Sequence, residues 1–291
     1  MNIKGKLIVI GGSVDKGNYG DTQADIHKKI LFTEKGILKR MIMESTNGSL
    51  SKIEVITTAS NIPEEIGAEY IQAFGKLEAL NVSVMNIKTR EEANSPEYLE
   101  RLKTADIVLF TGGDQLRLTP IFGGTAFHRL LLEKYELETF IIAGTSAGAA
   151  ASSNNMIYEG TSHEALCKGE VKITGGLGFI NNVIIDTHFV QRGRIGRLLY
   201  ACASNPINIG IGLGEDAGLL ITNGNDMEAL GSGLIMLVDA THMTDTNISD
   251  VMVGSLVSIE NLSVHVMSTG DHFNLKARKL KIHHPINLNT D

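Results

Sequence analysis

Three short apolar runs of this chain each end directly in a glycine-rich turn. The runs cover residues 6–10, 105–110 and 140–143, and the turns are Gly11-Gly12, Gly112-Gly113 and residues 144–148. Short continuous apolar runs are typical of strands that are buried on both faces of a parallel sheet. Glycine after such a strand permits a positive φ or a close backbone approach. Because ligands bind beyond the carboxyl ends of parallel strands, these turns predict where the functional site lies.

Helical patterns alternate with the apolar runs through the first half of the chain. Helices are predicted over residues 33–44, 63–77, 96–103 and 125–134, and further strands over 51–58 and 82–87. Alternation of this kind predicts an α/β fold with a mostly parallel sheet that helices cover on both faces. A three-layer α/β/α sandwich is therefore expected.

The second half of the chain has a different pattern. Strands are predicted over residues 183–189 and 208–213, with a helix over 191–203 between them. From residue 217 onward short β-like runs dominate, at 218–222, 233–238 and 262–267. These runs predict antiparallel strands that complete the sheet. We expect a single domain over residues 1–280 and a polar tail over 281–291.

Composition excludes several classes of protein. The 291 residues are 43% hydrophobic and 20% charged, and the net charge of −7 leaves no basic excess for nucleic acid. Two cysteines, Cys167 and Cys202, are too few for a disulfide framework. No run approaches the roughly 20 apolar residues of a membrane span, and the first apolar run is too short for a signal peptide. We expect a cytoplasmic protein with no membrane partner.

Ser146 is the candidate nucleophile. It lies in Gly144-Thr-Ser-Ala-Gly148, directly after an apolar strand and before small residues that suit the start of a helix. The G-x-S-x-G pattern is typical of a nucleophile elbow, in which a tight turn exposes the serine hydroxyl. The following helix start would offer N–H groups to a developing oxyanion. Similar turns also bind phosphates or only pack tightly, so the pentapeptide alone leaves these alternatives open.

A nucleophilic serine needs a base, and the base needs an orienting acid. Of nine histidines, His188 follows an apolar strand, and Glu215 and Asp216 follow another, so either acid could orient it. This chain order differs from the serine–acid–histidine order of α/β-hydrolases. That fold would require Asp216 with a later histidine, His242 or His265, which we rank lower because His265 lies within a β-like run.

Three arginines, Arg192, Arg194 and Arg197, form the concentrated positive charge near the predicted site. Guanidinium groups suit carboxylates, so they favour a substrate with carboxylate groups. Their spacing does not place all three on one helical stripe, so part of the set should precede the helix. A solvated helix face is the alternative interpretation.

Neither a metal nor a cofactor is expected. No group of histidine, cysteine and acidic residues has the spacing of a metal site, and His283-His284 lies in the predicted tail. Gly11-Gly12 lacks the third glycine of a dinucleotide fingerprint. Asp114 and Gln115, after Gly113, could hydrogen-bond a substrate. Asp186 could meet a substrate cation or fix its own loop.

Several motifs together resemble a known family. They are Leu7-Ile-Val-Ile-Gly-Gly12, Thr58-Ala-Ser-Asn-Ile-Pro-Glu-Glu65, Phe110-Thr-Gly-Gly-Asp-Gln115, Gly144-Thr-Ser-Ala-Gly-Ala149, Asp186-Thr-His-Phe189, Gln191-Arg-Gly-Arg-Ile-Gly-Arg-Leu198 and Gly212-Leu-Gly-Glu-Asp216. The chain, from about residue 6 to residue 280, is similar to the cyanophycinases. These belong to a serine peptidase family that also contains aspartyl dipeptidase (dipeptidase E).

The resemblance implies a fold akin to class I glutamine amidotransferases, which is flavodoxin-like, and a homodimer. It implies Ser146 as nucleophile, His188 as general base and then acid, and Glu215 as the orienting acid. The oxyanion would receive the backbone N–H groups of Ala147 and of Gly113 or a neighbour. The substrate pocket would be lined by Gln115, Asp186, Thr187, Arg192, Arg194 and Arg197.

The resemblance also implies a substrate. Cyanophycin is a poly-aspartate backbone that carries arginine on its β-carboxyls, and an exopeptidase would release β-Asp-Arg dipeptides. Asp186 is the candidate to receive the substrate guanidinium.

Two positions depart from the family pattern. Thr187 stands where cyanophycinases usually have glutamine, and Gly214-Glu-Asp-Ala-Gly218 where they often have Asp-Glu-Asp-Thr-Ala. Thr187 keeps an aspartyl dipeptidase open as an alternative, and a non-catalytic ligand-binding relative is a third interpretation.

Overall fold

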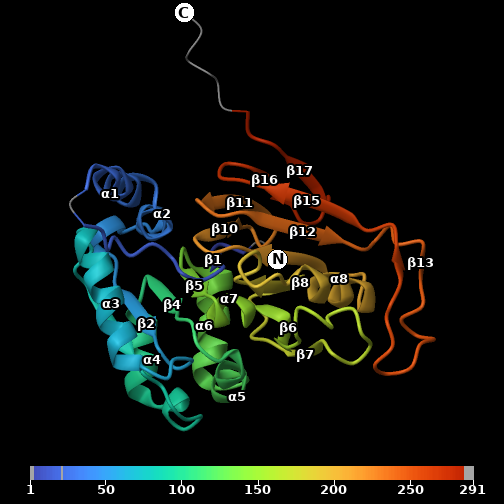
Figure 1. Ribbon diagram of the computed structural model, residues 1–291. Helices are drawn as coiled ribbons and strands as arrows, with labels where there is room; N and C mark the ends of the chain where they lie inside the picture. The colour runs from blue at the N-terminus through green and yellow to red at the C-terminus, as the bar shows by residue number, and fades with distance from the viewer. Residues whose placement is uncertain (1–2, 21, 285–291) are drawn as a thin grey trace, which may run out of the picture.

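A computed structural model describes residues 3–20 and 22–284, and its helices and strands alternate through the first half of the chain (Figure 1). The helices are α1 (Gln23–Lys35), α2 (Ile37–Glu44), α3 (Pro63–Lys76), α4 (Pro96–Thr104), α5 (Leu118–Phe122), α6 (Ala126–Leu137), α7 (Ala147–Ala150) and α8 (Ile195–Ser204). The strands of the first half are β1 (Lys6–Ile10), β2 (Ile53–Ile56), β3 (Val82–Met85), β4 (Ile107–Phe110) and β5 (Ile141–Thr145). The later strands are β6 (Ser153–Glu159), β7 (Lys172–Gly175), β8 (Ile180–Thr187), β9 (Ile209–Leu213), β10 (Ala217–Thr222), β11 (Asp226–Gly231), β12 (Ile235–Asp239), β13 (Asp245–Thr246), β14 (Ile259–Glu260), β15 (Ser263–Met267), β16 (His272–Asn274) and β17 (Lys279–Lys281).

The larger sheet has the order β17-β16-β11-β10-β1-β5-β4-β2-β3. Strands β1 to β5 pair in parallel, and β10, β11, β16 and β17 extend the sheet with antiparallel pairs. The predicted α/β class, with a parallel centre and antiparallel strands toward the C-terminus, is confirmed. The carboxyl ends of the parallel strands therefore meet at one edge, where the glycine-rich turns lie.

A second sheet was not foreseen. It has the order β15-β12-β9-β8-β6-β7, in which β6, β8 and β9 are parallel neighbours. The runs at 233–238 and 262–267 do not complete the main sheet as expected, because β12 pairs with β9 and β15 pairs with β12. The sequence pattern of a strand does not tell which sheet it joins.

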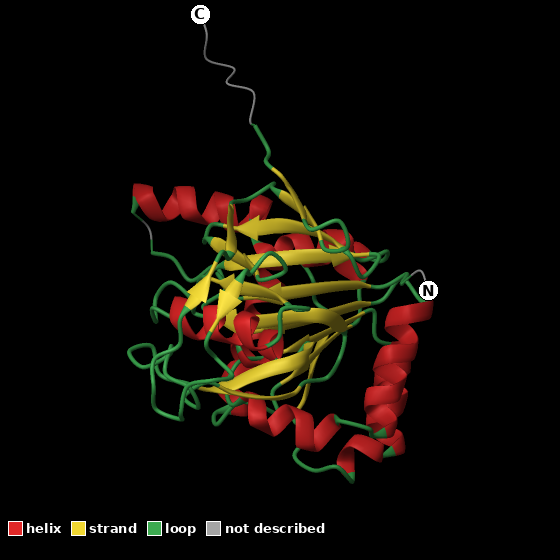
Figure 2. Ribbon diagram, turned by 90° about the vertical axis from the view of Figure 1, so that its right-hand side faces the viewer, coloured by secondary structure: helices red, strands yellow, loops and turns green. Residues whose placement is uncertain are grey.

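The two sheets share one core. The largest cluster of buried side chains takes Leu7 and Val9 from the main sheet and Ile185 and Ile211 from the second. The intervening residues Ile8 and Ile10 point to the opposite face, among buried side chains of α1, α2 and α3. Helix α8 packs on the outer face of the second sheet, and Figure 2 shows helices on both sides of the strands. The shared core supports the prediction of a single domain, which stays a prediction.

Some element boundaries differ from the predicted ones. The helix predicted over 33–44 is two helices, because the backbone of Gly36 is extended, with φ −61° and ψ 151°. Helix α1 begins earlier than predicted, at a capping box in which Thr22 and Asp25 bond each other's backbone N–H. The sequence signature of that box was overlooked.

The C-terminal region continues the main sheet further than expected. Strand β17 pairs with β16 through Leu280 opposite Phe273, so the predicted boundary at residue 280 falls within a strand. Of the predicted tail, residues 285–291 lie outside the described residues. Within the described ranges, no helix is long and apolar enough to cross a membrane.

Close packing behind the Ser146 turn depends on two glycines. A Cβ on Gly144 would lie 2.4 Å from the carbonyl carbon of Gly148, and a Cβ on Gly148 would lie 2.4 Å from the carbonyl oxygen of Phe110. Helix α7 can therefore approach β4 and β5 only because these positions lack side chains.

We predict that Gly144→Ala lowers the free energy of unfolding by about 3 kcal/mol, because the methyl group meets backbone that has no room to move. Gly75→Ala is the matched control. It lies in α3 with open space around its Cβ, and alanine there should raise stability by about 0.5–1 kcal/mol. Urea unfolding followed by circular dichroism measures both, and equal midpoints would contradict the packing argument.

Candidate active site

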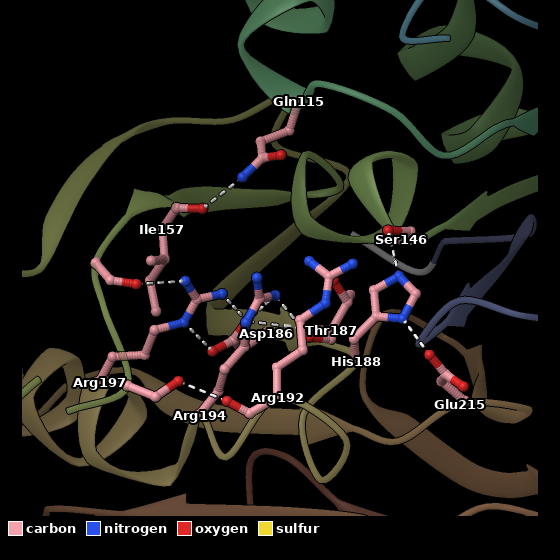
Figure 3. Close-up of polar contacts among 12 residues, drawn as sticks. Gln115, Ser146, Ile157, Asp186, Thr187, His188, Arg192, Arg194, Arg197 and Glu215 are labelled. Carbon is pink, nitrogen blue, oxygen red and sulfur yellow. Dashed lines mark hydrogen bonds and ion pairs between the residues drawn. The ribbon is translucent and has the colours of Figure 1, made fainter. Parts of the chain in front are cut away.

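Ser146 connects β5 to α7 in a strained conformation, with φ 51° and ψ −108°. Its backbone N–H donates to the carbonyl of Ile10 at 2.9 Å, which fixes the turn against β1. Its Oγ lies 3.0 Å from His188 Nε2 (Figure 3). The strand-to-helix turn, the positive φ and the hydroxyl that faces the cleft are typical of a nucleophile elbow.

His188 follows β8, so the second sheet supplies it. Its backbone, also at positive φ (49°), donates an N–H to the carbonyl of Gly11 at 2.8 Å. The imidazole packs directly on Gly12, where a Cβ would lie 2.3 Å from its Cε1. Glycine at position 12 therefore makes room for the histidine beside Ser146.

Glu215 follows β9 and accepts a hydrogen bond from His188 Nδ1 at Oε1, at 2.8 Å. This bond is the main reason that the pKa of Glu215 lies below its usual value, and the Ser13 hydroxyl lowers it further. The carboxylate is consequently ionised at neutral pH and fixes the imidazole with Nε2 toward the serine.

The competing acid, Asp216, is engaged elsewhere. Its carboxylate accepts hydrogen bonds from the Asp15 N–H at 3.2 Å and from the Ser232 hydroxyl at 2.6 Å. Of the two acids considered from sequence, Glu215 is the one that contacts His188. The α/β-hydrolase alternative also lacks support, since among the described residues neither His242 nor His265 bonds Asp216, and His265, on β15, packs against Phe273 of β16.

Two backbone N–H groups lie near the serine. Ala147 is the first residue of α7, so its N–H has no carbonyl one turn earlier in that helix. Gly113 belongs to the turn after β4, and a Cβ on its neighbour Gly112 would lie 3.3 Å from Ser146 Cβ. Gly113 has φ 142°, and a Cβ at this position would lie only 2.0 Å from the carbonyl oxygen of Ala59. Glycine is required where this turn passes the nucleophile.

A cleft of about 750 Å³ opens over Ser146 and His188. The structure brings most of the sequence-predicted site residues to its walls. Those that line it are Gly113, Gln115, Ser146, Asp186, Thr187, His188, Arg192, Arg194 and Arg197.

The sequence of this chain matches that of known peptidases over most of its length. The sequence model described as "Peptidase family S51" matches residues 32–228. The cyanophycinase of Trichormus variabilis is 34% identical over 275 residues, which cover 94% of this chain and 87% of that protein. The cyanophycinase of Geminocystis herdmanii is 31% identical, over 95% of this chain and 96% of that protein.

The chain belongs to peptidase family S51. The resemblance stated from the motifs and the prediction of a peptidase are thereby confirmed. A crystal structure of a peptidase from an acI-B1 actinobacterium has the same fold, with a TM-score of 0.63 at 20% identity, over 94% of this chain and 98% of that one.

In this S51 peptidase the arginines are not equivalent. Arg197, within α8, bonds the Asp186 carboxylate with Nε at 2.6 Å and with Nη2. Arg194, at the N-cap of α8, donates to the Thr187 carbonyl at 2.7 Å and to Asp186 at 3.3 Å. Burial lowers the pKa of Arg194 to about 10, so it stays charged at neutral pH. As expected, part of the arginine set precedes the helix, which begins at Ile195 rather than 191.

Asp186 is not placed to receive a substrate guanidinium. It is 2% exposed, and both of its oxygens already bond arginines of the same chain. Arg192 differs from the other two arginines, since among the described residues it forms no ion pair. Figure 3 shows Arg192 beside Arg194 and His188. Of the three arginines, Arg192 is therefore the one whose charge faces the cleft without a carboxylate partner.

Gln115 and Thr187 complete this flank of the cleft. Gln115 donates its Nε2 amide to the Ile157 carbonyl at 3.2 Å, which holds it over the cavity. Thr187 is 5% exposed, and its carbonyl fixes Arg194. A glutamine in its place would bring a longer amide side chain to the wall between Asp186 and His188.

The opposite flank was missed from the sequence. It is lined by Ser13, Asp15 and Lys16 after β1 and by Glu69 and Tyr70 of α3. Asp15 and Lys16 follow a strand and a glycine pair, which is the same signal that identified Ser146 and His188. The α3 residues carry no such signal, because only the packing of the helix brings them to the cleft.

We predict that Asp186→Asn lowers the free energy of unfolding by about 3–5 kcal/mol, because it leaves the buried Arg197 without a counter-charge. Thermal and urea unfolding measure the change. Glu159→Gln is the control: its partner Lys172 lies at 2.9 Å in an exposed pair, and its loss should leave the midpoint unchanged. Equal effects of the two substitutions would contradict the assigned role of Asp186.

Proposed function

We propose that this S51 peptidase is a serine-type exopeptidase that hydrolyses cyanophycin to β-Asp-Arg dipeptides through an acyl-enzyme on Ser146. The observation that carries the proposal is the continuous contact from Ser146 Oγ through His188 to Glu215. Two relatives that match nearly the whole chain are named cyanophycinases, which supports the choice of substrate.

In the proposed reaction, His188 Nε2 takes the proton of Ser146 Oγ as that oxygen attacks the scissile carbonyl. The negative charge that develops on the carbonyl oxygen is stabilised by the N–H groups of Ala147 and Gly113. His188 then donates the proton to the leaving amine, and the C–N bond breaks. A water molecule, deprotonated by His188, attacks the ester carbonyl and releases Ser146. His188 returns this proton to Ser146 Oγ as the ester C–O bond breaks, and Glu215 orients the ring in both its neutral and its protonated form.

Substrate recognition follows from the charges of the cleft. A poly-aspartate backbone presents carboxylates, and Arg192 offers a guanidinium without a competing partner among the described residues. Arg194 is held against Thr187 and adds positive charge to the same wall. Asp186 and Arg197 are positioning residues in this proposal, and Gln115 and Thr187 shape the pocket.

A dipeptidase for short α- or β-aspartyl peptides is the second candidate. It is favoured by Thr187, which gives the pocket wall a small side chain. A non-catalytic binder is less well supported, because binding alone does not require a histidine 3.0 Å from a serine. We further propose a homodimer located in the cytoplasm, with one peptidase domain that extends through β17 (Lys279–Lys281). A monomer in sedimentation equilibrium would contradict the homodimer.

We expect Ser146→Ala to reduce release of β-Asp-Arg by about 10⁵–10⁶-fold, because no other group supplies the attacking oxygen. Chromatographic detection of the dipeptide measures the loss, and calorimetry checks that the variant still binds substrate. Ser249→Ala, on an exposed loop, is the control that should keep full activity. An acylating reagent should modify the wild-type protein and not the Ser146 variant, and an active Ser146→Ala variant would rule out the mechanism.

The choice of substrate is tested by comparing insoluble cyanophycin with short Asp-X peptides at equal enzyme concentration. The proposal expects a higher rate of bond cleavage on the polymer. Faster cleavage of α- or β-aspartyl dipeptides would favour the dipeptidase. No cleavage of either, with no acylation of Ser146, would favour the binder.

A further inference from the structure

The two flanks of the cleft carry opposite kinds of free charge. On the flank of β8 and α8 the unpaired group is a cation, Arg192. On the flank of β1 and α3 the lining residues include a carboxylate, Asp15. Ser146 and His188 lie in the same cavity. A polymeric substrate bound across Ser146 would therefore contact both flanks of the cleft.

The backbone fixes Asp15 close to the catalytic groups. It is three residues beyond Gly12, which touches the His188 imidazole. Its own N–H donates to Asp216, and its Oδ1 accepts the N–H of Gly17 at 2.9 Å. The other oxygen, Oδ2, forms no hydrogen bond with any described residue. One carboxylate oxygen thus holds the loop, and the second is available to a ligand.

The nearby lysines do not neutralise Asp15. Lys16 pairs with Glu69 and lies over the Tyr70 ring, with Nζ 4.6 Å from the ring centroid. Lys76 donates its Nζ to the Gly17 carbonyl at 2.9 Å and to Asn18 Oδ1 at 2.6 Å. Within the described residues no cation lies within ion-pair distance of Asp15.

Burial is the main reason that the pKa of Asp15 is raised, and the neighbouring Asp216 carboxylate raises it further. The N–H of Gly17 and the more distant charges of Lys76 and Lys28 act in the opposite direction, so the ionised form is only partly stabilised in the free protein. A cation bound at Oδ2 would stabilise the ionised form of Asp15 further.

We propose that Asp15 receives the guanidinium of the substrate arginine that lies on the β1 flank, and so makes the peptidase selective for arginine-bearing aspartyl chains. This inference rests on the proposed function, because it assigns a group of that substrate to this side of the same cleft. A guanidinium suits the position, since its planar N–H groups can bond a carboxylate that keeps one oxygen for the loop. Arg192 on the far flank would meet a carboxylate of the same chain.

The test compares two synthetic oligomers, one of β-Asp-Arg units and one of β-Asp-citrulline units. Citrulline has the shape of arginine without its charge. The wild-type protein should prefer the arginine oligomer in kcat/KM. Asp15→Asn, which keeps an oxygen for the Gly17 N–H, should lower kcat/KM for the arginine oligomer by about 10- to 100-fold. The loss on the citrulline oligomer should be far smaller.

Two further variants make the result specific. Asp15→Glu keeps the charge and should retain part of the preference for arginine. Asp250→Asn, an exposed residue of the β13–β14 connection, should leave the preference as in the wild type. Equal losses of Asp15→Asn on both oligomers, or no loss, would overturn the assignment of Asp15 while leaving the proposed function intact. A wild-type protein that hydrolyses neither oligomer would contradict the proposed function and this inference together.

Discussion

The catalytic geometry depends on how closely two sheets approach at Gly11 and Gly12. Strand β1 ends there, and its last carbonyl, on Ile10, accepts the N–H of Ser146. The Gly11 carbonyl accepts the N–H of His188, and the Gly12 carbonyl accepts the N–H of Asp216. A Cβ on Gly11 would lie 2.0 Å from the Gly214 carbonyl oxygen. Three consecutive carbonyls therefore align Ser146, His188 and the residue beside Glu215, which are the groups of the proposed catalytic triad, and no larger residue fits at Gly11 or Gly12.

This junction explains why the catalytic groups come from separate sheets. Ser146 follows β5 of the main sheet, whereas His188 and Glu215 follow β8 and β9 of the second. Each group is at the carboxyl end of a parallel strand, where a rigid element stops and a side chain can project. Side chains of both sheets pack together in one core. Because protein cores are densely packed, this core fixes the position of one sheet relative to the other.

The sequence predicts those parts of this arrangement that depend on neighbouring residues, and not those that depend on contacts between distant segments. Ser146, His188 and the pair Glu215 and Asp216 are predicted from local pattern, because each follows an apolar strand, whereas the choice of Glu215 over Asp216 rests on the family resemblance. The second sheet could not be predicted, since the pairing of β12 with β9 is a choice among partners distant in sequence. The sequence left open whether Asp186 meets a substrate cation or a group of its own chain for the same reason, because its partner Arg197 reaches it only when α8 packs on the second sheet.

The number of charged side chains that line the cleft is larger than the number that have no ion-pair partner within the described residues. Three arginines suggested a strongly cationic pocket, yet Arg197 is committed to a carboxylate that is itself buried. We therefore expect replacement of Asp186 or Arg197 to act on folding, and replacement of Arg192 to act on substrate binding. On the other flank Lys16 is likewise paired with Glu69, which leaves Asp15 as the charge of that wall that has no ion-pair partner among the described residues. In our proposal, selectivity of the cleft is set by the charges that the fold leaves unpaired, Arg192 and Asp15, which are fewer than the charged residues that line it.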